Sequence, residues 1–273
     1  MVTFPRFAAF ALALVVLATL ERLAPRRIPA SGASRRWTAN LGLLAIDVAA
    51  VSIIAPGAAV GVALAAQSHG WGLVNVLPIP AWLALPLSVA LLDLAIYFQH
   101  VTFHAIPTLW RLHRVHHSDV DFDVSTGVRF HPVEILISVG IKCAAVAAIG
   151  ASPAAVIAFE ILLNTSSLFN HSNLLMPRWL DRGLRLFLVT PDMHRVHHSV
   201  RYNESSSNFG FCLPWWDHLC GTYRAQPAQP HESMPIGVDA FREASEGRLD
   251  RLLTQPSRDT PGGYSINRRP EAG

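Results

Sequence analysis

Five long apolar runs limit what this chain can fold into. A helix that crosses a membrane needs about 20 mostly apolar residues, and the runs are close to that length. Only 15% of the 273 residues are charged, whereas a soluble domain has about 25%, and the mean hydropathy is +0.31. We therefore predict an all-α integral-membrane helical bundle with about four to five spans. The runs cover Phe4–Leu23, Leu41–Ala66, Ala81–His104, Pro132–Ile149 and Ala154–Phe169.

The positions of lysine and arginine orient these spans. Residues 67–80 and the turn at 150–153 contain neither residue type, whereas residues 24–40, residues 105–131 and the chain after residue 170 hold nearly all of them. Because positive residues favour the cytoplasmic side of a membrane, we expect the N-terminus outside and the tail in the cytoplasm, most naturally at the cell inner membrane. The net charge of +3 belongs to these flanks. No basic patch with interleaved aromatic residues indicates a nucleic-acid partner.

The first run has a second interpretation, a cleaved signal peptide. The arginines between residues 26 and 36 follow it without a clear small-residue cleavage site, which favours a retained span.

Two charged residues lie inside the apolar runs. Lys142, the only lysine of the chain, and Glu160 are each nine residues from the turn centred near residue 151. Charges inside a span are costly and need partners. We expect a structural Lys142–Glu160 ion pair between two neighbouring spans, with a proton relay as the alternative.

Histidine is the residue type that indicates chemistry. An H-x-x-H-H box occurs twice, as the shared string H-R-V-H-H-S, and an H-x-x-x-H pair precedes the first copy. These spacings place each set on one face of a helix, and all of them map to the same cytoplasmic boundary. We expect a helical cap there that holds the histidines together. They are His100 and His104, then His113, His116 and His117, then His194, His197 and His198, with His131 and His171 at span ends.

Such a cluster predicts metal binding. Protonated imidazoles would repel one another, whereas neutral imidazole is a metal ligand. One ion takes four to six ligands, so eight to ten histidines suit two ions. Iron, zinc and copper all accept imidazole, so the ligands alone leave the element open. Cys143, Cys212 and Cys220 have no C-x-x-C spacing and do not predict a thiolate site.

The histidine boxes resemble those of the fatty acid hydroxylase/sterol desaturase superfamily, which comprises integral-membrane non-haem di-iron oxygenases. Further matching words run from about residue 85 to 255 and include DLAIYFQH, LWRLHRVHHSD, RFHPVE, VTPDMHRVHHS, NFGF and WWDHLCGTYR. The resemblance implies that the eight box histidines bind iron, with His171 from an intermediate motif. Two positions depart from the family pattern. Val101 stands where the family often has arginine, and Ser167 stands where some members have a second histidine of the intermediate motif. The number of ligands to one metal therefore stays open. His131 could complete the set or only cap the next helix.

The resemblance also implies the chemistry. Two iron ions and O2 would hydroxylate or desaturate a lipophilic substrate such as a sterol or a fatty acyl lipid. Two electrons per cycle would come from a separate ferredoxin or cytochrome with its reductase. Asp93 and Asp47 could orient ligand histidines by accepting their outer N–H. The implied organisation is N-terminal transmembrane helices in 1–80, a catalytic domain in 81–225 and a partly disordered cytoplasmic tail in 226–273.

Two rival functions stay open at this level. A membrane zinc hydrolase would use histidine ligands, but it needs only one open site with a nearby carboxylate base. A non-enzymatic haem or metal carrier would place histidines deep in several spans. Metal content and dependence on O2 separate all three.

Overall fold

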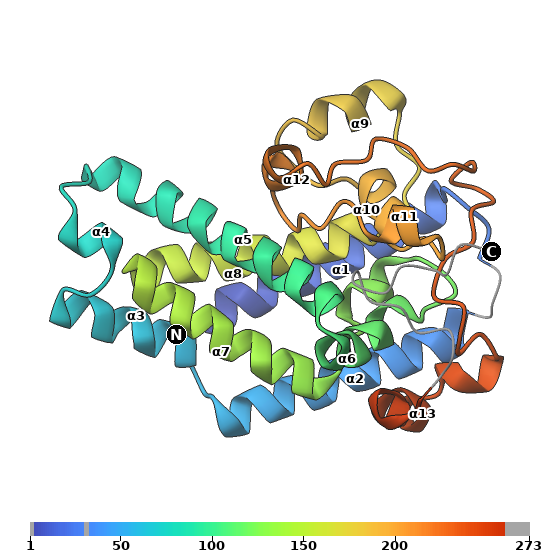
Figure 1. The fold of residues 1–273 in the computed structure, drawn as a ribbon, viewed down its shortest axis with the longest axis horizontal. Helices are drawn as coiled ribbons and strands as arrows, with labels where there is room; N and C mark the ends of the chain where they lie inside the picture. The colour runs from blue at the N-terminus through green and yellow to red at the C-terminus, as the bar shows by residue number, and fades with distance from the viewer. Residues whose placement is uncertain (1–2, 30–32, 260–273) are drawn as a thin grey trace.

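The computed structural model describes residues 3–29 and 33–259, and within these ranges the chain is helical, without strands. This confirms the predicted all-α class. The long helices run along the longest axis of the molecule, and the short ones, except α4 at the opposite end, gather at one end of it (Figure 1). The long helices are α1 (Thr3–Leu23), α2 (Ala33–Ile54), α3 (Ala58–His69), α5 (Ala81–Ala105), α7 (Pro132–Ile149) and α8 (Pro153–Asn170). The short ones are α4 (Leu73–Val76), α6 (Pro107–His117), α9 (Arg178–Leu184), α10 (Pro191–His197), α11 (Tyr202–Ser205), α12 (Trp215–Cys220) and α13 (Leu249–Thr254), with 3₁₀ turns η1 (Val124–Val128), η2 (Ala244–Gly247) and η3 (Gln255–Ser257).

Three segments of the described chain are long and apolar enough to cross a membrane: Ser34–Val76, Ala81–Ala105 and Pro132–Ile149. The α1 and α8 helices, which correspond to the first and last predicted runs, are not among them. Both pack in the same bundle, against each other. The predicted count of four to five spans therefore stays a prediction.

The second apolar run is two helices where the sequence predicts one. The α2 helix ends at Ile54 and α3 begins at Ala58, with Pro56 and Gly57 between them. Proline has no N–H to donate to the preceding turn, and Gly57 has φ of 64°, in the left-handed region that glycine tolerates. The break lets α3 pack its alanines against α7.

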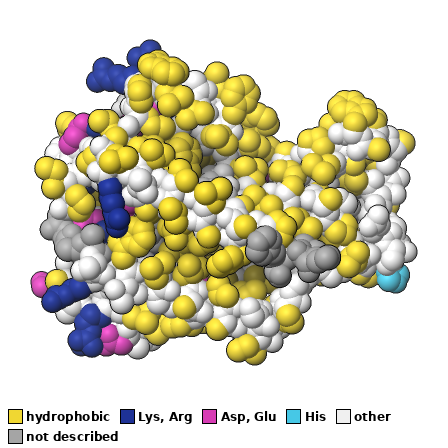
Figure 2. Space-filling model, turned by 180° about the vertical axis from the view of Figure 1, so that it is seen from behind, with side chains coloured by type: hydrophobic (Ala, Val, Ile, Leu, Met, Phe, Trp, Pro, Cys, Tyr) yellow, Lys and Arg dark blue, Asp and Glu magenta, His cyan; other side chains and the backbone are white. Residues whose placement is uncertain are grey.

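The surface of the bundle is apolar over most of its length. Figure 2 shows hydrophobic side chains across the middle of one face, with the charged side chains gathered at one end of it. Trp82 and Ile53 are 78% and 80% exposed. Side chains of this kind are ordinary where the surrounding medium is lipid.

The α7 helix ends and α8 begins at one tight turn, and the two helices separate away from it. They meet at a tight turn where a side chain at Gly72 would collide with the backbone of Gly150, at 2.1 Å. From this turn the two helices diverge, with α2 and α5 contacting α7 and with α1 and α5 contacting α8 (Figure 1).

The chain after residue 226 is partly a packed element. Leu252 of α13 is fully buried against Ala39, Leu43 and Val115, so this segment covers α2 and α6. The predicted disorder concerns the last dozen residues, and residues 260–273 lie outside the described chain.

Candidate metal centre

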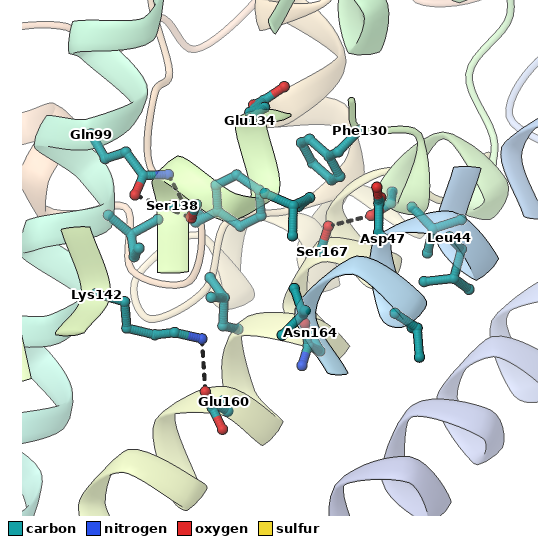
Figure 3. Close-up of a pocket in the computed structure, with 18 of the residues that line it drawn as sticks. Leu44, Asp47, Gln99, Phe130, Glu134, Ser138, Lys142, Glu160, Asn164 and Ser167 are labelled. Carbon is teal, nitrogen blue, oxygen red and sulfur yellow. Dashed lines mark hydrogen bonds and ion pairs between the residues drawn. The ribbon is translucent and has the colours of Figure 1, made fainter. Parts of the chain in front are cut away.

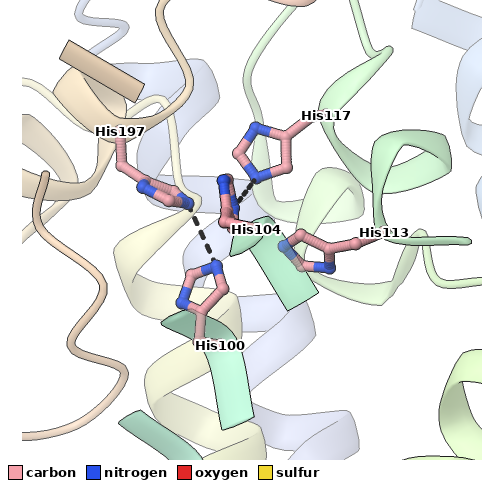
Figure 4. A group of neighbouring side chains, drawn as sticks. All are labelled: His100, His104, His113, His117 and His197. Atoms are coloured by element: carbon pink, nitrogen blue, oxygen red, sulfur yellow. Dashed lines mark hydrogen bonds between the residues drawn. The ribbon is translucent and has the colours of Figure 1, made fainter. Parts of the chain in front are cut away.

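Nine of the ten predicted histidines come together in two groups. Within each group one side-chain nitrogen of every member lies within 4.8 Å of those of the others, and all nine residues are buried. Figure 4 shows the rings of the first group facing a common point. Group one contains His100, His104, His113, His117 and His197, and group two contains His116, His171, His194 and His198.

Helix geometry divides each box between the two groups. On α6, His113 and His117 are four residues apart and join group one, while His116 turns to group two. The second copy mirrors this division: His194 and His198 join group two, and His197 crosses to group one.

The spacing of the nitrogens fits a metal ion. Nε2 atoms of neighbouring rings lie 3.1 Å apart between His104 and His117, and 3.0 Å apart between His197 and His100. In group two, His171 Nε2 lies 3.1 to 3.2 Å from Nε2 of its three partners. Two imidazole nitrogens each about 2.1 Å from one metal ion, and at tetrahedral or smaller angles, would be separated by about 3.0 to 3.4 Å. The distances therefore suit two imidazole-bound ions.

Backbone carbonyls fix the orientation of three rings. His100 Nδ1 donates to the Phe209 carbonyl oxygen at 2.7 Å, His197 Nδ1 to that of Ser207 at 2.8 Å, and His171 Nδ1 to that of Ser167 at 2.7 Å. A carbonyl oxygen can only accept, so these Nδ1 atoms bear the proton. The lone pair of each ring is then on Nε2, which faces the group.

Glu134, at the start of α7, orients a fourth ring. His113 Nδ1 lies 2.6 Å from Glu134 Oε1, and both residues are buried. His113 Nε2 is buried without a hydrogen-bond partner among the described residues. A buried nitrogen lone pair without a donor is costly, and a metal ion would satisfy it. Glu134 has no predicted role, although it ends the matched word RFHPVE, which was the available signal.

Burial keeps these imidazoles neutral. Desolvation lowers the pKa of His113 to about 3 and that of His171 to about 3. The pKa values of His116, His117, His194, His197 and His198 are also held well below the ordinary value, first by burial and then by neighbouring histidines. Neutral imidazole is the form that coordinates metal.

His131 belongs to neither group. Its Nδ1 accepts a hydrogen bond from the Val133 backbone N–H at 3.2 Å, which caps the N-terminus of α7, and its Nε2 contacts the Leu253 carbonyl oxygen. Inclusion of His131 among the metal ligands is thus corrected: it caps a helix, the other role open to it. Its place just before Pro132, at the first turn, explains this role.

Within the described chain neither Asp93 nor Asp47 forms a hydrogen bond with a histidine. Asp93 instead accepts from the backbone N–H groups of Cys212 and Leu213 and from Trp216 Nε1. It thereby holds the loop whose Phe209 carbonyl orients His100, so its effect on the centre is indirect. Asp47 faces a cavity, and its Oδ1 is buried without a hydrogen-bond partner among the described residues.

A charged cluster supports the loop after the first box. Arg36 of α2 forms a bidentate ion pair with Asp119, at 2.7 and 2.8 Å, and a further one with Asp123 at 2.7 Å. Burial alone would raise the pKa of Asp119, but the charges of Arg36 and Arg129 outweigh it and hold the pKa below its ordinary value. These contacts link α2 to the segment between α6 and η1.

A cavity of about 490 Å³ leads to group one. It lies between α7 and α8 and is lined also by α1, α2 and α5, with His100 and His113 at one end. Phe103, Phe130 and Phe211 contribute apolar walls near these histidines. Among the described residues that line it, no histidine of group two occurs.

Lys142 and Glu160 meet at the other end of this cavity. Lys142 Nζ lies 2.7 Å from Glu160 Oε1, and Arg6 of α1 forms an ion pair with the same carboxylate. Figure 3 shows this contact far from Glu134, with the Gln99–Ser138 hydrogen bond between the two ends. Lys142 and Glu160, which the sequence predicts to pair, are therefore in contact. They also line a cavity that the sequence does not reveal.

Comparisons with known proteins agree with this geometry. Over 196 residues the chain is 30% identical to the ornithine lipid hydroxylase OlsE of Rhizobium tropici, covering 72% of this chain and 56% of that protein. It is also 30% identical over 141 residues to the alkylglycerol monooxygenase of Homo sapiens, covering 49% of this chain and 29% of the relative. The chain thus spans little more than half the length of these curated relatives, or less. No solved structure matches. A family model described as fatty acid hydroxylase matches residues 85–222, half of the chain, and this integral membrane protein therefore belongs to the fatty acid hydroxylase family.

Proposed function

We propose that this chain is a membrane-bound non-haem di-iron oxygenase that hydroxylates a lipid. The observation that supports it best is the division of nine buried, neutral histidines into two adjacent groups, one of which borders a cavity between apolar helices. The relatives named hydroxylase and monooxygenase favour hydroxylation over desaturation. Their names also favour lipids with a polar part, such as an ornithine lipid or an alkylglycerol.

The two histidine groups would hold one iron each, group one with five histidines and group two with four. Iron bound here would supply the reduction of O2 and the oxidation of a C–H bond. The overall balance consumes one C–H bond, O2, two electrons and two protons, and gives one C–OH group and water. The doubled H-x-x-H-H box thereby serves two ions.

The residues around the two groups orient the ligands and shape the site. The carbonyls of Phe209, Ser207 and Ser167 and the carboxylate of Glu134 hold four rings in one tautomer and direction. The phenyl rings that line the cavity exclude water from group one and bring an apolar part of the substrate to it. We assign this activity to residues 81–225. The electrons would come from a separate ferredoxin or cytochrome with its reductase, and the histidine end would face the cytoplasm at the inner membrane.

The direct test is iron analysis with Mössbauer spectroscopy on protein grown in labelled iron and purified in detergent. We expect about two irons per chain with a coupled di-ferric signal, one for each group. O2 uptake with reductant and extracted membrane lipids, followed by mass spectrometry, should give products heavier by one oxygen atom. One tightly bound zinc that persists under iron supplementation, with no O2 uptake, would refute the proposal in favour of a hydrolase.

A further inference from the structure

The cavity has two chemically different ends. At one end are His100 and His113, and at the other are Lys142, Glu160 and Arg6. Glu134 and Lys142 are eight residues apart on α7, so the two ends are separated by about 12 Å along that helix. A molecule that fills the cavity would thus meet the metal centre with one part and a charged cluster with another.

The charged cluster has hydrogen-bonding capacity left over. An ammonium group has three donors, and within the described chain Lys142 forms one hydrogen bond, to Glu160. The Lys142 side chain is 17% exposed, and the surface beside it is the cavity. Glu160 is shared with Arg6, so one carboxylate faces two cations. The cluster therefore favours an additional oxygen acceptor, preferably a negatively charged one.

A purely structural ion pair would not need this location. The α7 and α8 helices diverge from their turn, and both members of the pair line the cavity between them. Charges at such depth are costly, and inside membranes they commonly mark the path of a substrate. The polar positions Glu134, Ser138 and Lys142 recur every fourth residue on α7, so they line the cavity as one row.

We propose that Lys142, held by the Glu160 carboxylate that Arg6 also contacts, binds an oxyanion of the substrate and sets which carbon reaches group one. The substrate class is then a lipophilic molecule with a carboxylate or phosphate about 12 Å from the carbon that reacts. This inference rests on the proposed function for the identity of the reacting end. The oxyanion contact itself needs neither iron nor O2.

The test uses the purified, metal-loaded chain in detergent and a fluorescent polyene fatty acid, cis-parinaric acid, with its methyl ester as the uncharged match. The acid should bind about tenfold or more tightly than the ester, because a hydrogen bond to a charged group is lost in the ester. Lys142→Met should remove this preference by weakening the acid alone. Lys142→Arg should restore it, and Arg178→Met, which removes an exposed charge on α9, should leave it unchanged.

Equal binding of acid and ester by the unaltered chain would overturn the proposal without any variant. An unchanged acid-to-ester ratio in folded Lys142→Met would overturn it as well. If that variant does not fold, Lys142→Gln replaces it, since glutamine keeps a donor but no charge. Failure here would leave the iron content and O2 uptake untouched, so it is distinguishable from failure of the proposed function.

Discussion

The two copies of H-R-V-H-H-S are identical in sequence but differ in what surrounds them. In the first copy His113 donates to a carboxylate, whereas its counterpart in the second copy, His194, has Nδ1 buried with no acceptor among the described residues. At the second histidine the difference is reversed: His197 donates to the Ser207 carbonyl, and His116 has no acceptor for Nδ1 among the described residues.

Because each H-x-x-H-H box is divided between the two groups, these differences give the groups unequal numbers of rings with an Nδ1 acceptor. Three rings of group one have an Nδ1 acceptor, namely His100, His113 and His197. In group two His171 has such an acceptor, while Nδ1 of His116, His194 and His198 is buried without one in the described chain. Group one also has five histidines against four. A repeated motif has thus produced two unequal sites, with group one the more firmly held and the one next to the cavity.

The largest expected effect comes from removing one histidine from each group. His194→Ala leaves group two with three histidines, and we expect it to lose its iron, so that the content falls to about one per chain. His104→Ala leaves group one with four and should retain nearly two. Loss of a residue that only hydrogen-bonds to a metal ligand lowers activity by up to about a hundredfold. His194 would itself be a ligand, so the activity of His194→Ala should fall by more than that. Iron analysis of both variants measures the iron content, and an O2-uptake assay measures the activity. Equal loss of iron in the two variants would contradict the difference between the two groups.

The arginines of the two boxes should differ in how much they contribute to the stability of the protein. Arg195 is fully buried and forms an ion pair with Asp192, which has Arg26 as a second partner. Arg195→Met therefore removes one of two cations beside this carboxylate and should cost about 2 to 3 kcal/mol of unfolding free energy. Arg114 donates to the carbonyls of Gln255 and Arg258, and Arg114→Met should cost about 1 to 2 kcal/mol. Denaturant unfolding in detergent gives both values. The reverse order would show that the tail, not the second box, holds the cap together.

Much of this organisation follows from sequence because it depends on local spacing. The H-x-x-x-H and H-x-x-H-H patterns put histidines on one helical face, and the structure gathers nine of them. The break between α2 and α3 could have been read from Pro56 and Gly57, but a long apolar run hides it. The hydropathy of a run does not depend on whether it forms one continuous helix or two.

What the sequence could not predict depends on contacts between distant segments. The role of Asp93 depends on a loop more than a hundred residues later in the chain, and a helical period cannot show which backbone N–H groups come to it. Glu134 reaches His113 only because α6 and α7 pack together after the η1 turn. His131 could be a ligand or a cap from its sequence position, and only the course of the chain decides between them.

The smallest predicted effect tests the acceptor of His113. Glu134→Gln removes the negative charge but keeps an oxygen that accepts from Nδ1, so the ring should hold its direction while becoming a weaker base. We expect about a tenfold lower iron affinity in group one, at the low end of what such partners contribute, and no change in group two.

Iron release to a chelator would measure this difference directly. The unaltered chain should release its iron in two phases, group two first, and His194→Ala should lack the faster phase. In Glu134→Gln the slower phase should move toward the faster one, because the feature that holds group one has been weakened. If the faster phase changed instead, Glu134 would support the site that it does not touch, and the assignment of the stronger site to group one would be wrong.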